Sequence, residues 1–387
     1  MIKKLNEVCR FYSGTGFPVA YQGKSDGELP FYKVGDIANN VAIGNVYLSL
    51  CNNYISRQEA SEIRGSIIPK DTVVFAKIGE ALKLNRRALT NCDCLIDNNA
   101  MGIAPMREFL RTGYFFYFMK QLKMQEHAEA TTVPSVRKSK LEQVEIEVPS
   151  LNKQEEIELI LSNISMVIHS RQQQLQKMDE LVKARFVELF GDMGYNPNGW
   201  EKVNLGSVCD VRDGTHDSPK YFPEGYPLVT SKNVTSGRID FTDCSLICKE
   251  DYNKINERSR VDFGDILMPM IGTVGKPVVV DVDVDFAIKN VALIKFYKDS
   301  KVINTFVRAL LQSDYFDRAV ISKIRGGTQK FIALSDIRKL EFYLPPMDTQ
   351  NQFAAFVGQT DKAKLAVQKA LDETQLLFDS LMQKYFR

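Results

Sequence analysis

The stretch that decides the fold runs from residue 157 to residue 189 and reads IELILSNISMVIHSRQQQLQKMDELVKARFVEL. Ten of its positions, from Ile157 to Leu189, follow one another at alternating steps of four and three residues, which is the period of a coiled coil. Eight of these ten residues are apolar, and the exceptions are Arg171 and Arg185. The stretch contains no proline, so it predicts one uninterrupted helix with an apolar stripe along one side.

A second stripe with the same spacing begins 196 residues further along the chain, at Phe353. Val367 and Leu381 stand where the first stripe has its arginines, and Lys364 stands where the first has Ile168. Complementary interruptions of this kind favour a helix pair over two amphipathic helices that each dock on their own domain. Each helix should run for about 35–40 residues, or roughly 50–60 Å. The residues predicted to pair are Ile157, Leu161, Ile164, Ile168, Leu175, Met178, Val182 and Leu189 with Phe353, Val357, Val367, Leu371, Phe378, Leu381 and Tyr385.

The remainder of the chain is repeated as well. Residues 5–9 match residues 205–209, residues 73–79 match residues 266–272, and residues 136–144 match residues 332–340. Two copies of about 195 residues are too long for solenoid units, so each copy is a domain with a long helix. We predict an α+β fold in which two mixed α/β domains are each followed by a long helix, and the helices form an antiparallel coiled coil with pseudo-two-fold symmetry. The predicted segments are domain 1–148, helix and linker 149–196, domain 197–344 and helix 345–387.

Within each copy, short β-rich runs precede a longer helical stretch. Apolar runs at residues 72–78, 265–271 and 277–282 are bounded by glycine or proline and predict strands. Phenylalanine, leucine and tyrosine recur at helical spacing over residues 109–126 and 302–324. These two stretches predict helices whose aromatic residues pack in the domain cores.

Composition and charge exclude several classes of protein. The 387 residues include 50 Lys and Arg against 48 Asp and Glu, a formal net charge of +2, so any nucleic-acid binding must come from local patches. No apolar run of about 18 residues predicts a membrane helix, and no secretory signal precedes the first domain. The seven cysteines are an odd number, which favours reduced thiols in a cytoplasmic protein. The sequence favours no structural metal, because two short cysteine pairs and three histidines make a weak zinc pattern.

The sequence also predicts no catalytic site and no cofactor. The only Pro-Pro pair, at 345–346, lies outside the loop that an amino-methyltransferase requires. Residues 272–276 (GTVGK) resemble half of a phosphate loop, but Pro277 stands where Ser or Thr must hold magnesium. His216, Asp217 and Ser218 are adjacent in sequence and therefore cannot adopt the geometry of a catalytic triad.

Two polar loops at equivalent places are the first candidates for recognition. Loop 2, residues 212–221, follows a predicted strand, and loop 1, residues 13–24, is its counterpart in the first copy. The two loops are expected to differ completely on a shared framework, as recognition loops do, although a solvated turn is the alternative. The candidate DNA-binding residues here are Thr15 and Lys24 in loop 1 and Thr215, His216, Ser218 and Lys220 in loop 2.

Basic segments just before each long helix are the second candidates. Lysine and arginine neutralise phosphates, and Arg or Gln can bond two atoms of a guanine or adenine edge. A basic surface loop without a partner is the alternative. The candidate DNA-binding residues in these segments are Thr131, Thr132, Arg137 and Lys138 in the first copy and Arg325, Thr328, Gln329 and Lys330 in the second. Lys33 of the first copy and Lys232 and Asn233 of the second occupy equivalent places in the repeat and are further candidates for the same surface.

Together these features resemble a known family. Each long helix opens in a Pro-x4-Gln segment, IEVPSLNKQ at 146–154 and FYLPPMDTQ at 342–350. The first helix closes with ARFVELFG at 184–191, and the second domain carries DGTHDSPKY at 213–221 and GTQKFIALS at 327–335. The arrangement of these segments over the whole chain resembles the specificity subunit of type I restriction–modification enzymes. The first copy departs from the pattern, because it has Thr131 and Thr132 in place of Gly-Thr-Gln.

The resemblance implies a function without catalysis by this chain. In that family each variable domain, called a target-recognition domain, reads one half of a split, asymmetric site in double-stranded DNA. The helices act as a spacer and dock two modification (methyltransferase) subunits, and restriction and translocase subunits complete the complex. Two other functions stay open at this point: a stand-alone DNA-binding regulator and a structural coiled-coil adaptor.

Overall fold

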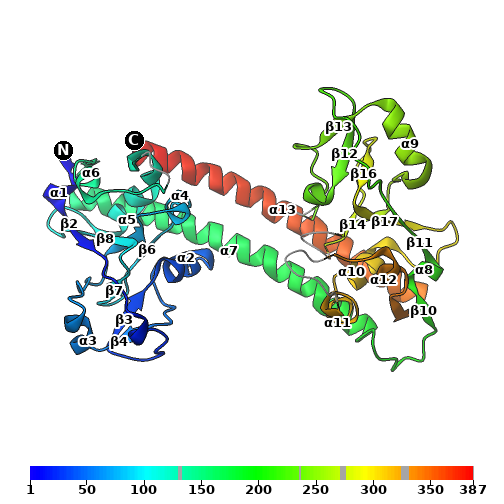
Figure 1. Cartoon of the computed structure of the whole chain (residues 1–387), viewed down its shortest axis with the longest axis horizontal. Coiled ribbons are helices and arrows are strands. Elements are labelled where there is room, and N and C mark those ends of the chain that lie inside the picture. The colour runs from blue at the N-terminus through cyan, green and yellow to red at the C-terminus, as the bar shows by residue number, and fades with distance from the viewer. Residues whose placement is uncertain (130–132, 235–236, 271–275, 324–330, 387) are drawn as a thin grey trace. The chain divides into compact units, whose positions relative to one another are not determined.

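The computed structural model describes residues 1–129, 133–234, 237–270, 276–323 and 331–386. The chain divides into two compact units, and each is described by itself. Unit 1 comprises Met1–Gln173 and Gln368–Arg387, and unit 2 comprises Gln174–Val367. The long helices α7 (Leu151–Phe190) and α13 (Met347–Tyr385) each contribute one half to unit 1 and the other half to unit 2 (Figure 1).

The described residues of the domain of unit 1 form three small sheets. Their strand orders are β1-β9, β2-β8-β5-β6 and β4-β3-β7, and only the β3–β7 pair is parallel among these strands. The strands are β1 (Ile2–Lys4), β2 (Cys9–Ser13), β3 (Leu29–Tyr32), β4 (Tyr54–Ile55), β5 (Val73–Ala76), β6 (Arg87–Leu89), β7 (Leu95–Ile96), β8 (Ala100–Pro105) and β9 (Glu145–Glu147). The helices are α1 (Leu5–Val8), α2 (Val34–Ala42), α3 (Arg57–Glu62), α4 (Glu80–Lys83), α5 (Thr112–Gln121) and α6 (Lys138–Leu141), with 3-10 turns at Val19–Tyr21 and Met124–His127.

The domain of unit 2 repeats this topology strand for strand. Its sheets have the orders β10-β18, β11-β17-β14-β15 and β13-β12-β16, and β12–β16 is again the parallel pair. This correspondence confirms the internal repeat. The strands are β10 (Lys202–Asn204), β11 (Cys209–Asp213), β12 (Tyr226–Thr230), β13 (Ser245–Ile247), β14 (Ile266–Pro269), β15 (Val278–Val279), β16 (Ala287–Lys289), β17 (Val291–Phe296) and β18 (Glu341–Tyr343). The helices are α8 (Leu205–Val208), α9 (Lys249–Ser259), α10 (Asn304–Leu311), α11 (Asp314–Ala319) and α12 (Leu334–Arg338), with 3-10 turns at Ser231–Val234 and Ile321–Lys323.

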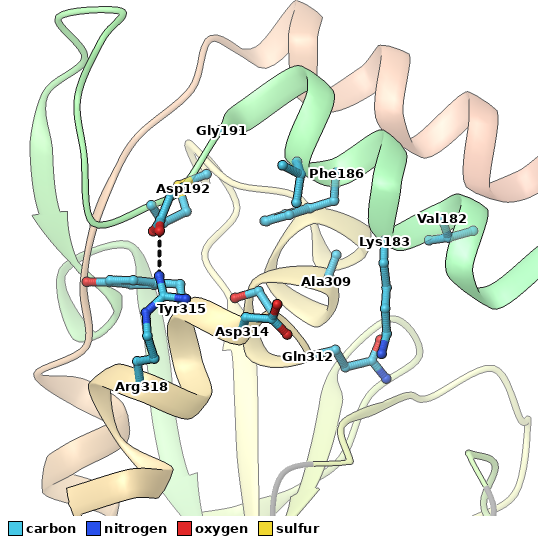
Figure 2. Close-up of a pocket in the computed structure, with 13 residues that line it drawn as sticks. Val182, Lys183, Phe186, Gly191, Asp192, Ala309, Gln312, Asp314, Tyr315 and Arg318 are labelled. Carbon is cyan, nitrogen blue, oxygen red and sulfur yellow. Dashed lines mark hydrogen bonds and ion pairs between the residues drawn. The ribbon is translucent and has the colours of Figure 1, made fainter.

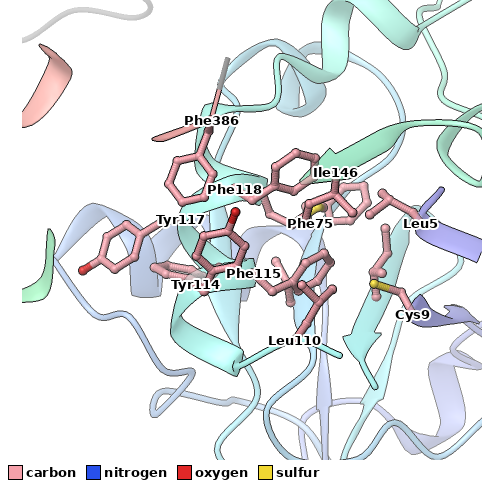
Figure 3. Packing of buried hydrophobic residues seen from close by; sticks show 14 of the residues in the cluster. Leu5, Cys9, Phe75, Leu110, Tyr114, Phe115, Tyr117, Phe118, Ile146 and Phe386 are labelled. Carbon is pink, nitrogen blue, oxygen red and sulfur yellow. The ribbon is translucent and has the colours of Figure 1, made fainter. Parts of the chain in front are cut away.

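The core of unit 1 gathers around α5, as the aromatic pattern predicted. Seven of the ten residues of α5 are buried, among them Tyr114 and Phe115. Figure 3 shows these rings beside Phe75 of β5 and beside Phe386, which follows α13. The buried Tyr114 hydroxyl donates a hydrogen bond to the Glu147 carbonyl at 2.9 Å, so its one polar group is satisfied. Burial of this kind ties the domain to the end of the second long helix.

The single helix predicted over residues 302–324 is wrong. The structure has α10 and α11 there, separated at Gln312 and Ser313. The Ser313 hydroxyl accepts a hydrogen bond from the Phe316 backbone N–H and so caps α11. Serine favours such an N-cap over a helix interior, and this local preference overrides the apolar spacing.

A buried glutamine fixes the start of each long helix and explains the Pro-x4-Gln segments. Gln154 is fully buried, accepts a hydrogen bond from the Arg111 N–H at 2.8 Å and donates to two backbone carbonyls. Gln350 repeats this pattern with the Ile303 N–H at 3.0 Å. Each side chain therefore bonds the first turn of its own helix to the start of α5 or α10, because a buried amide must satisfy its donors and acceptors.

In each unit the two long helices run antiparallel. In unit 2, Lys364 of α13 forms an ion pair with Asp179 of α7. Phe353 lies eleven residues before Lys364, and its ring centre is 5.4 Å from that of Phe190, which lies eleven residues after Asp179. In unit 1, Arg171 donates to the Ala370 carbonyl and the Thr374 hydroxyl. All twenty residues of the two predicted stripes are buried or half-buried.

The expected match between Arg171 and Val367 is wrong, and so is the match between Lys364 and Ile168. An antiparallel pair brings together positions that lie at opposite ends of the repeat, so residues 196 apart do not face each other. The polar interruptions instead find polar partners of their own. Arg185, for example, places its guanidinium 5.8 Å from the ring centre of Phe356 and pairs with Glu188 at 2.8 Å.

Candidate nucleic-acid interface

Both recognition loops leave their sheets at a glycine, Gly14 or Gly214, where two backbone segments pass very close to each other. We call this close approach the glycine crossing. Thr15 and Thr215 each form an isolated parallel bridge with a segment next to the sheet. A Cβ atom built on the preceding Gly14 would lie 1.7 Å from a backbone carbonyl oxygen, and one built on Gly214 would lie 2.2 Å from another. Only glycine lets two backbones approach this closely, so Gly-Thr is a framework element in both copies.

The expectation that the two loops differ completely is therefore wrong for their first residues. Gly14 and Thr15 occupy the same structural positions as Gly214 and Thr215, because the same backbone crossing must be made. The loops diverge from Gly16 and His216 onward. Beyond that point, different contacts hold the two loops.

A buried carboxylate organises loop 2. Asp213, which is 7% exposed, accepts hydrogen bonds from the His216 ring at 2.9 Å and from the Arg258 guanidinium. The Ser259 hydroxyl donates to the Asp213 carbonyl at 2.5 Å. The other ring nitrogen of His216 lies 2.8 Å from the Asn290 side-chain oxygen. We name Asp213, His216, Arg258 and Asn290 the Asp213 cluster.

The Asp213 cluster engages both ring nitrogens of His216. Both ring nitrogens face oxygen atoms, so only the protonated imidazole can donate to both. The hydrogen bonds to Asn290 and then to Asp213 raise the pKa of His216 above its ordinary value. Although the side chain is 62% exposed, its polar atoms are engaged within the protein, and it fixes the loop in place.

A cleft of about 210 Å³ lies between loop 2 and helix α9. The Lys289 ammonium donates to the Ser218 hydroxyl at 2.5 Å, and Lys220 and Lys254 are exposed. Sequence reasoning missed α9, although Lys254 and Arg258 are four residues apart and so share one face of that helix. The residues that line the cleft are Gly214, Thr215, Asp217, Ser218 and Pro219 from the loop and Asp251, Lys254, Ile255, Arg258 and Ser259 from α9.

Loop 1 is held by an aromatic stack instead of a carboxylate. The ring of Phe17 stacks on Phe31 of β3 with centres 3.8 Å apart and planes 8° apart. The Lys33 ammonium lies 5.4 Å from the Phe17 ring centre and donates to the Gln22 side chain at 2.6 Å. Lys33 therefore stabilises the loop from within, in addition to any contact with DNA.

Three other predicted cations of unit 1 also have partners in the protein. Lys24 pairs with Glu59, Arg137 pairs with Glu129 at 2.7 Å, and Lys138 lies 3.6 Å from Glu142. These side chains are 44 to 69% exposed, so solvent screens the pairs and each contributes little stability. A phosphate could replace such a partner at small cost.

Asn233 does not suit the role that its sequence position suggested. It is 4% exposed, its side-chain oxygen accepts from both the N–H and the hydroxyl of Thr230, and its amide donates to the Asp240 carbonyl. These bonds hold the turn after β12, which the sequence could not reveal. Lys232 beside it is exposed. Thr131, Thr132, Arg325, Thr328, Gln329 and Lys330 lie outside the described residues.

Unit 2 has a second, more apolar cleft of about 250 Å³ at the end of α7 (Figure 2). Phe186 and Val187 line one wall, and Ala309 and Tyr315 belong to the α10–α11 side. An ion pair of 2.5 Å between Arg318 and Asp192 crosses its rim. Its apolar walls suit a protein side chain better than a phosphate.

None of the described helices combines the length and the apolarity needed to cross a membrane. Within the described ranges, no three or more His, Cys, Asp or Glu side chains gather as metal ligands would.

Comparison with known proteins places this arrangement in one family. The family model described as "Type I restriction modification DNA specificity domain" matches residues 1–179 and again residues 197–374. The MjaIX specificity subunit of Methanocaldococcus jannaschii is 23% identical, with 99% of this chain and 91% of that protein covered. The EcoBI specificity subunit of Escherichia coli is 23% identical over 55% of this chain and 46% of its own length.

Solved structures show the same fold. The crystal structure of a type I restriction-modification S subunit from M. genitalium superimposes on this chain with a TM-score of 0.57 at 14% sequence identity. The match covers 100% of this chain and 96% of that chain. A structure described as bearing on complex assembly and conformational transition of the type I R-M system has a TM-score of 0.58 at 20% identity, with 100% of this chain and 97% of that chain covered.

Proposed function

Because this chain belongs to the type I restriction modification DNA specificity domain family, we propose that it is the DNA-recognition subunit of a type I restriction–modification complex. In this proposal each domain reads one half of a bipartite, asymmetric site in double-stranded DNA. The two long helices set the distance between the half-sites. The chain itself neither methylates nor cleaves DNA, and it acts in the cytoplasm, where the DNA and its partner subunits are.

One observation carries the proposal of two different half-sites. Two domains with the same strand order present loops that leave the same glycine crossing and then differ in chemistry. Loop 1 is ordered by stacked rings, and loop 2 is ordered by the charged Asp213 cluster. A shared framework with divergent loops is what two readers of unlike sequences require.

The DNA-facing groups of the second reader are proposed from the described residues around loop 2. Ser218 and Lys220 on the loop and Lys254 on α9 line or flank one cleft. Lysines there would neutralise phosphates, and Ser218 could bond a base edge. His216 positions the loop instead of reading a base. Thr328 and Gln329 remain candidates for base contacts.

The proposed partners follow from the family. Two methyltransferase subunits would dock on the helix pair, and restriction and translocase subunits would complete the assembly. In unit 1, the domain covers one side of the helix pair. Positions that follow a stripe residue, such as Glu158 and Met382, contact the domain of unit 1.

Methylation mapping tests the function directly. Host DNA is mapped with and without this chain, in the presence of the modification subunit. The expected result is a bipartite motif that disappears when the chain is absent. A purified chain that consumed S-adenosylmethionine or nicked DNA by itself would overturn the proposal, and an unchanged motif without the chain would point to a regulator or an adaptor.

A matched pair of lysine variants tests the interface of the second reader. Lys254→Ala should weaken DNA binding and lower the slope of log affinity against log salt by about 1, because one phosphate contact is lost. Lys298→Ala is the control, since this exposed lysine follows β17 at the opposite end of the sheet from loop 2. An equal effect of both variants would mean that the cleft is not the DNA-facing side.

A further inference from the structure

Helix α9 of unit 2 presents a polar face that makes no contacts within the protein. Its inner side packs on the domain: the Tyr252 ring stacks on Tyr226 of β12 with centres 4.1 Å apart, and Ile255 packs against the same small apolar cluster. The outer side is exposed. Among the described residues, the exposed side chains of α9 that take part in no ion pair and no hydrogen bond are Lys249, Glu250, Asn253, Lys254 and Glu257, which we name the α9 free face.

The charges of the α9 free face stay unpaired although their spacing permits pairing. Glu250 and Lys254 are four residues apart with the acid first, which is the favourable order for an ion pair on a helix surface. Within the part of the chain that the structure describes, the two side chains form no such pair. This face can therefore bind a ligand without first breaking contacts of its own.

The equivalent helix of unit 1, α3, lacks such a face. It follows β4 as α9 follows β13, but it has six residues where α9 has eleven. Each charged side chain of α3 has a partner in the protein. Glu59 pairs with Lys24. Glu62 accepts a hydrogen bond from the Tyr21 hydroxyl at 2.8 Å, and Arg57 lies 4.0 Å from a glutamate carboxylate. The free face is therefore a property of the second copy and not of the shared framework.

The side chains follow one another around α9 in an order that separates cations from the other polar groups. Successive residues of an α-helix are turned by about 100°, so Asn253 and Glu257 lie about 40° apart in the middle of the exposed arc. Lys249 lies about 40° beyond Asn253, and Lys254 lies about 60° beyond Glu257, toward Arg258. Amide and carboxylate groups thus occupy the middle of the arc, and a cation stands at each edge.

This order matches the major groove of DNA. The groove is about 12 Å wide and admits one α-helix, with base edges at its floor and phosphates along its two walls. Cations at both edges of the arc suit the two walls. In the middle, an asparagine amide can bond two atoms of an adenine edge, and a glutamate can accept a hydrogen bond from the amino group of cytosine. The eleven residues of α9 are about 16 Å long, which is the rise of about five base pairs.

Loop 2 is bonded to this helix. Arg258 of α9 donates to the Asp213 carboxylate, and the Ser259 hydroxyl donates to the Asp213 carbonyl at 2.5 Å. Lys254, at one edge of the α9 free face, also lines the cleft that loop 2 closes on its other side. Helix and loop are therefore held in one arrangement, and a duplex that contacts loop 2 reaches the edge of the α9 free face as well.

We propose that α9 is a recognition helix that enters the major groove of the half-site read by unit 2, where Asn253 and Glu257 contact base edges and Lys249 and Lys254 contact phosphates. This inference rests on the proposed function for the identity of the ligand, and it adds base-reading residues that lie outside both recognition loops. Asn253 and Glu257 are about 6 Å apart along the helix axis, so the base pairs they read lie within about two steps of each other.

The experiment uses the full chain with its modification subunits and measures equilibrium binding to duplexes that carry each single base-pair change in both half-sites. Asn253→Ala should lower discrimination by roughly 5- to 100-fold at one base pair of one half-site and leave the other positions unchanged. Asn198→Ala, at an exposed asparagine of the linker before β10, is the matched control and should change no position. Discrimination that Asn253→Ala leaves unaltered, or lowers equally at all positions, would overturn the inference.

A change in the DNA identifies the groove and the contacted atom. Replacement of each adenine in turn by 7-deazaadenine removes the N7 acceptor of the major groove and keeps the base pair. One such replacement should weaken binding of the wild-type complex by roughly 2- to 10-fold and have no further effect on the Asn253→Ala complex. Losses from the base and from the side chain that multiply at every position would show that the two do not touch, and the inference would fail.

Glu257→Gln tests the second reader of bases on α9. Glutamine bonds two atoms of an adenine edge, whereas glutamate accepts from cytosine, so the variant should shift the preferred base from cytosine toward adenine at a second base pair. That base pair should lie within about two steps of the one affected by Asn253→Ala. Both side chains are exposed, so an unfolding transition equal to that of the wild type is the folding control. A preference that Glu257→Gln leaves unchanged at all positions would contradict the proposed role of Glu257.

The outcomes separate this inference from the proposed function. If the wild-type complex binds all duplexes alike, the proposed function itself fails. If the wild-type complex discriminates in both half-sites and the α9 variants discriminate equally well, only the recognition helix fails. Variants that weaken association with the modification subunit and leave discrimination intact would assign the α9 free face to that partner and refute its role in DNA binding.

Discussion

Loop 1 and loop 2 occupy the same place in two repeated domains, yet different forces hold them. In loop 1 the Phe17 ring stacks on Phe31, and Lys33 lies over the same ring. In loop 2 the carboxylate of Asp213 bonds His216 and Arg258. Both loops begin with the same glycine and with the threonine that follows it.

This difference shows how one framework can serve two readers. The crossing at Gly14 and Gly214 and the glutamines Gln154 and Gln350 fix where the loop and the helix begin. Beyond the crossing, the two loops are held by different contacts, the Phe17 stack in loop 1 and the Asp213 cluster in loop 2. The comparison therefore predicts that changes in the framework affect both copies alike, whereas changes in a loop affect one half-site only.

The largest effect is expected from the framework glutamines. Gln154→Ala and Gln350→Ala each leave a buried N–H and two carbonyls without partners, at about 1–3 kcal/mol for each orphaned group. We expect each variant to lower the free energy of unfolding by about 3–5 kcal/mol, by similar amounts, as measured by urea denaturation. The exposed Gln352→Ala is the control and should change stability by no more than about 0.5 kcal/mol. A large loss from only one of the two buried glutamines would break the equivalence of the copies.

The next effect concerns loop 2 alone. Asp213→Asn removes the charge that holds Arg258 and His216, and we expect a loss of about 1–2 kcal/mol of stability, since both partners are largely exposed. Discrimination should fall at one half-site, measured by methylation of duplexes with single base changes. Ser13→Ala, at the matching position of loop 1, is the control. Loss of discrimination at both half-sites would contradict one reader per half-site.

A smaller effect should mark loop 1. Phe17→Leu keeps an apolar side chain but removes the ring stack with Phe31, which contributes about 0.5–1.5 kcal/mol. In the same methylation assay, the Phe17→Leu variant should lose discrimination at one half-site, and this should be the half-site that the Asp213→Asn variant leaves unaffected. Phe263→Leu is the control, because Phe263 is 77% exposed and has no stacked partner among the described rings. If the Phe17 and Asp213 variants affected the same half-site, the comparison of the loops would fail.

The smallest effect is a dependence on pH in loop 2. The pKa of His216 is raised in the folded protein, so the protonated ring stabilises loop 2 fully below its unfolded pKa of about 6.5. This contribution is lost as the pH rises through the folded pKa. Discrimination at the second reader's half-site should therefore weaken from about pH 6.5 upward, while the other half-site changes less. His216→Gln should remove the difference in pH dependence, and a profile unchanged by this variant would exclude His216 as its source.

The sequence by itself determined the repeat, the two long helices and their apolar stripes. A stripe is a local property, because positions three and four residues apart share a face of a helix wherever the helix lies. The strands at residues 73–76, 266–269 and 278–279 could also be predicted from the sequence, because short apolar runs bounded by glycine or proline are local signals. The Gly-Thr crossing was present in both loops but needed the structure to be recognised.

Only the tertiary structure decided which residues meet. The His216 ring bonds the side chain of Asn290, 74 residues further along the chain, and Arg258 of α9 bonds Asp213. No spacing of residues in the sequence therefore predicts the Asp213 cluster. The antiparallel direction of the helices decides that Arg171 meets Thr374 and not Val367. Contacts between distant segments depend on strand register and on how the domains pack against the helices. A periodic pattern fixes the face that a residue occupies, whereas its partner across that face is set by the fold as a whole.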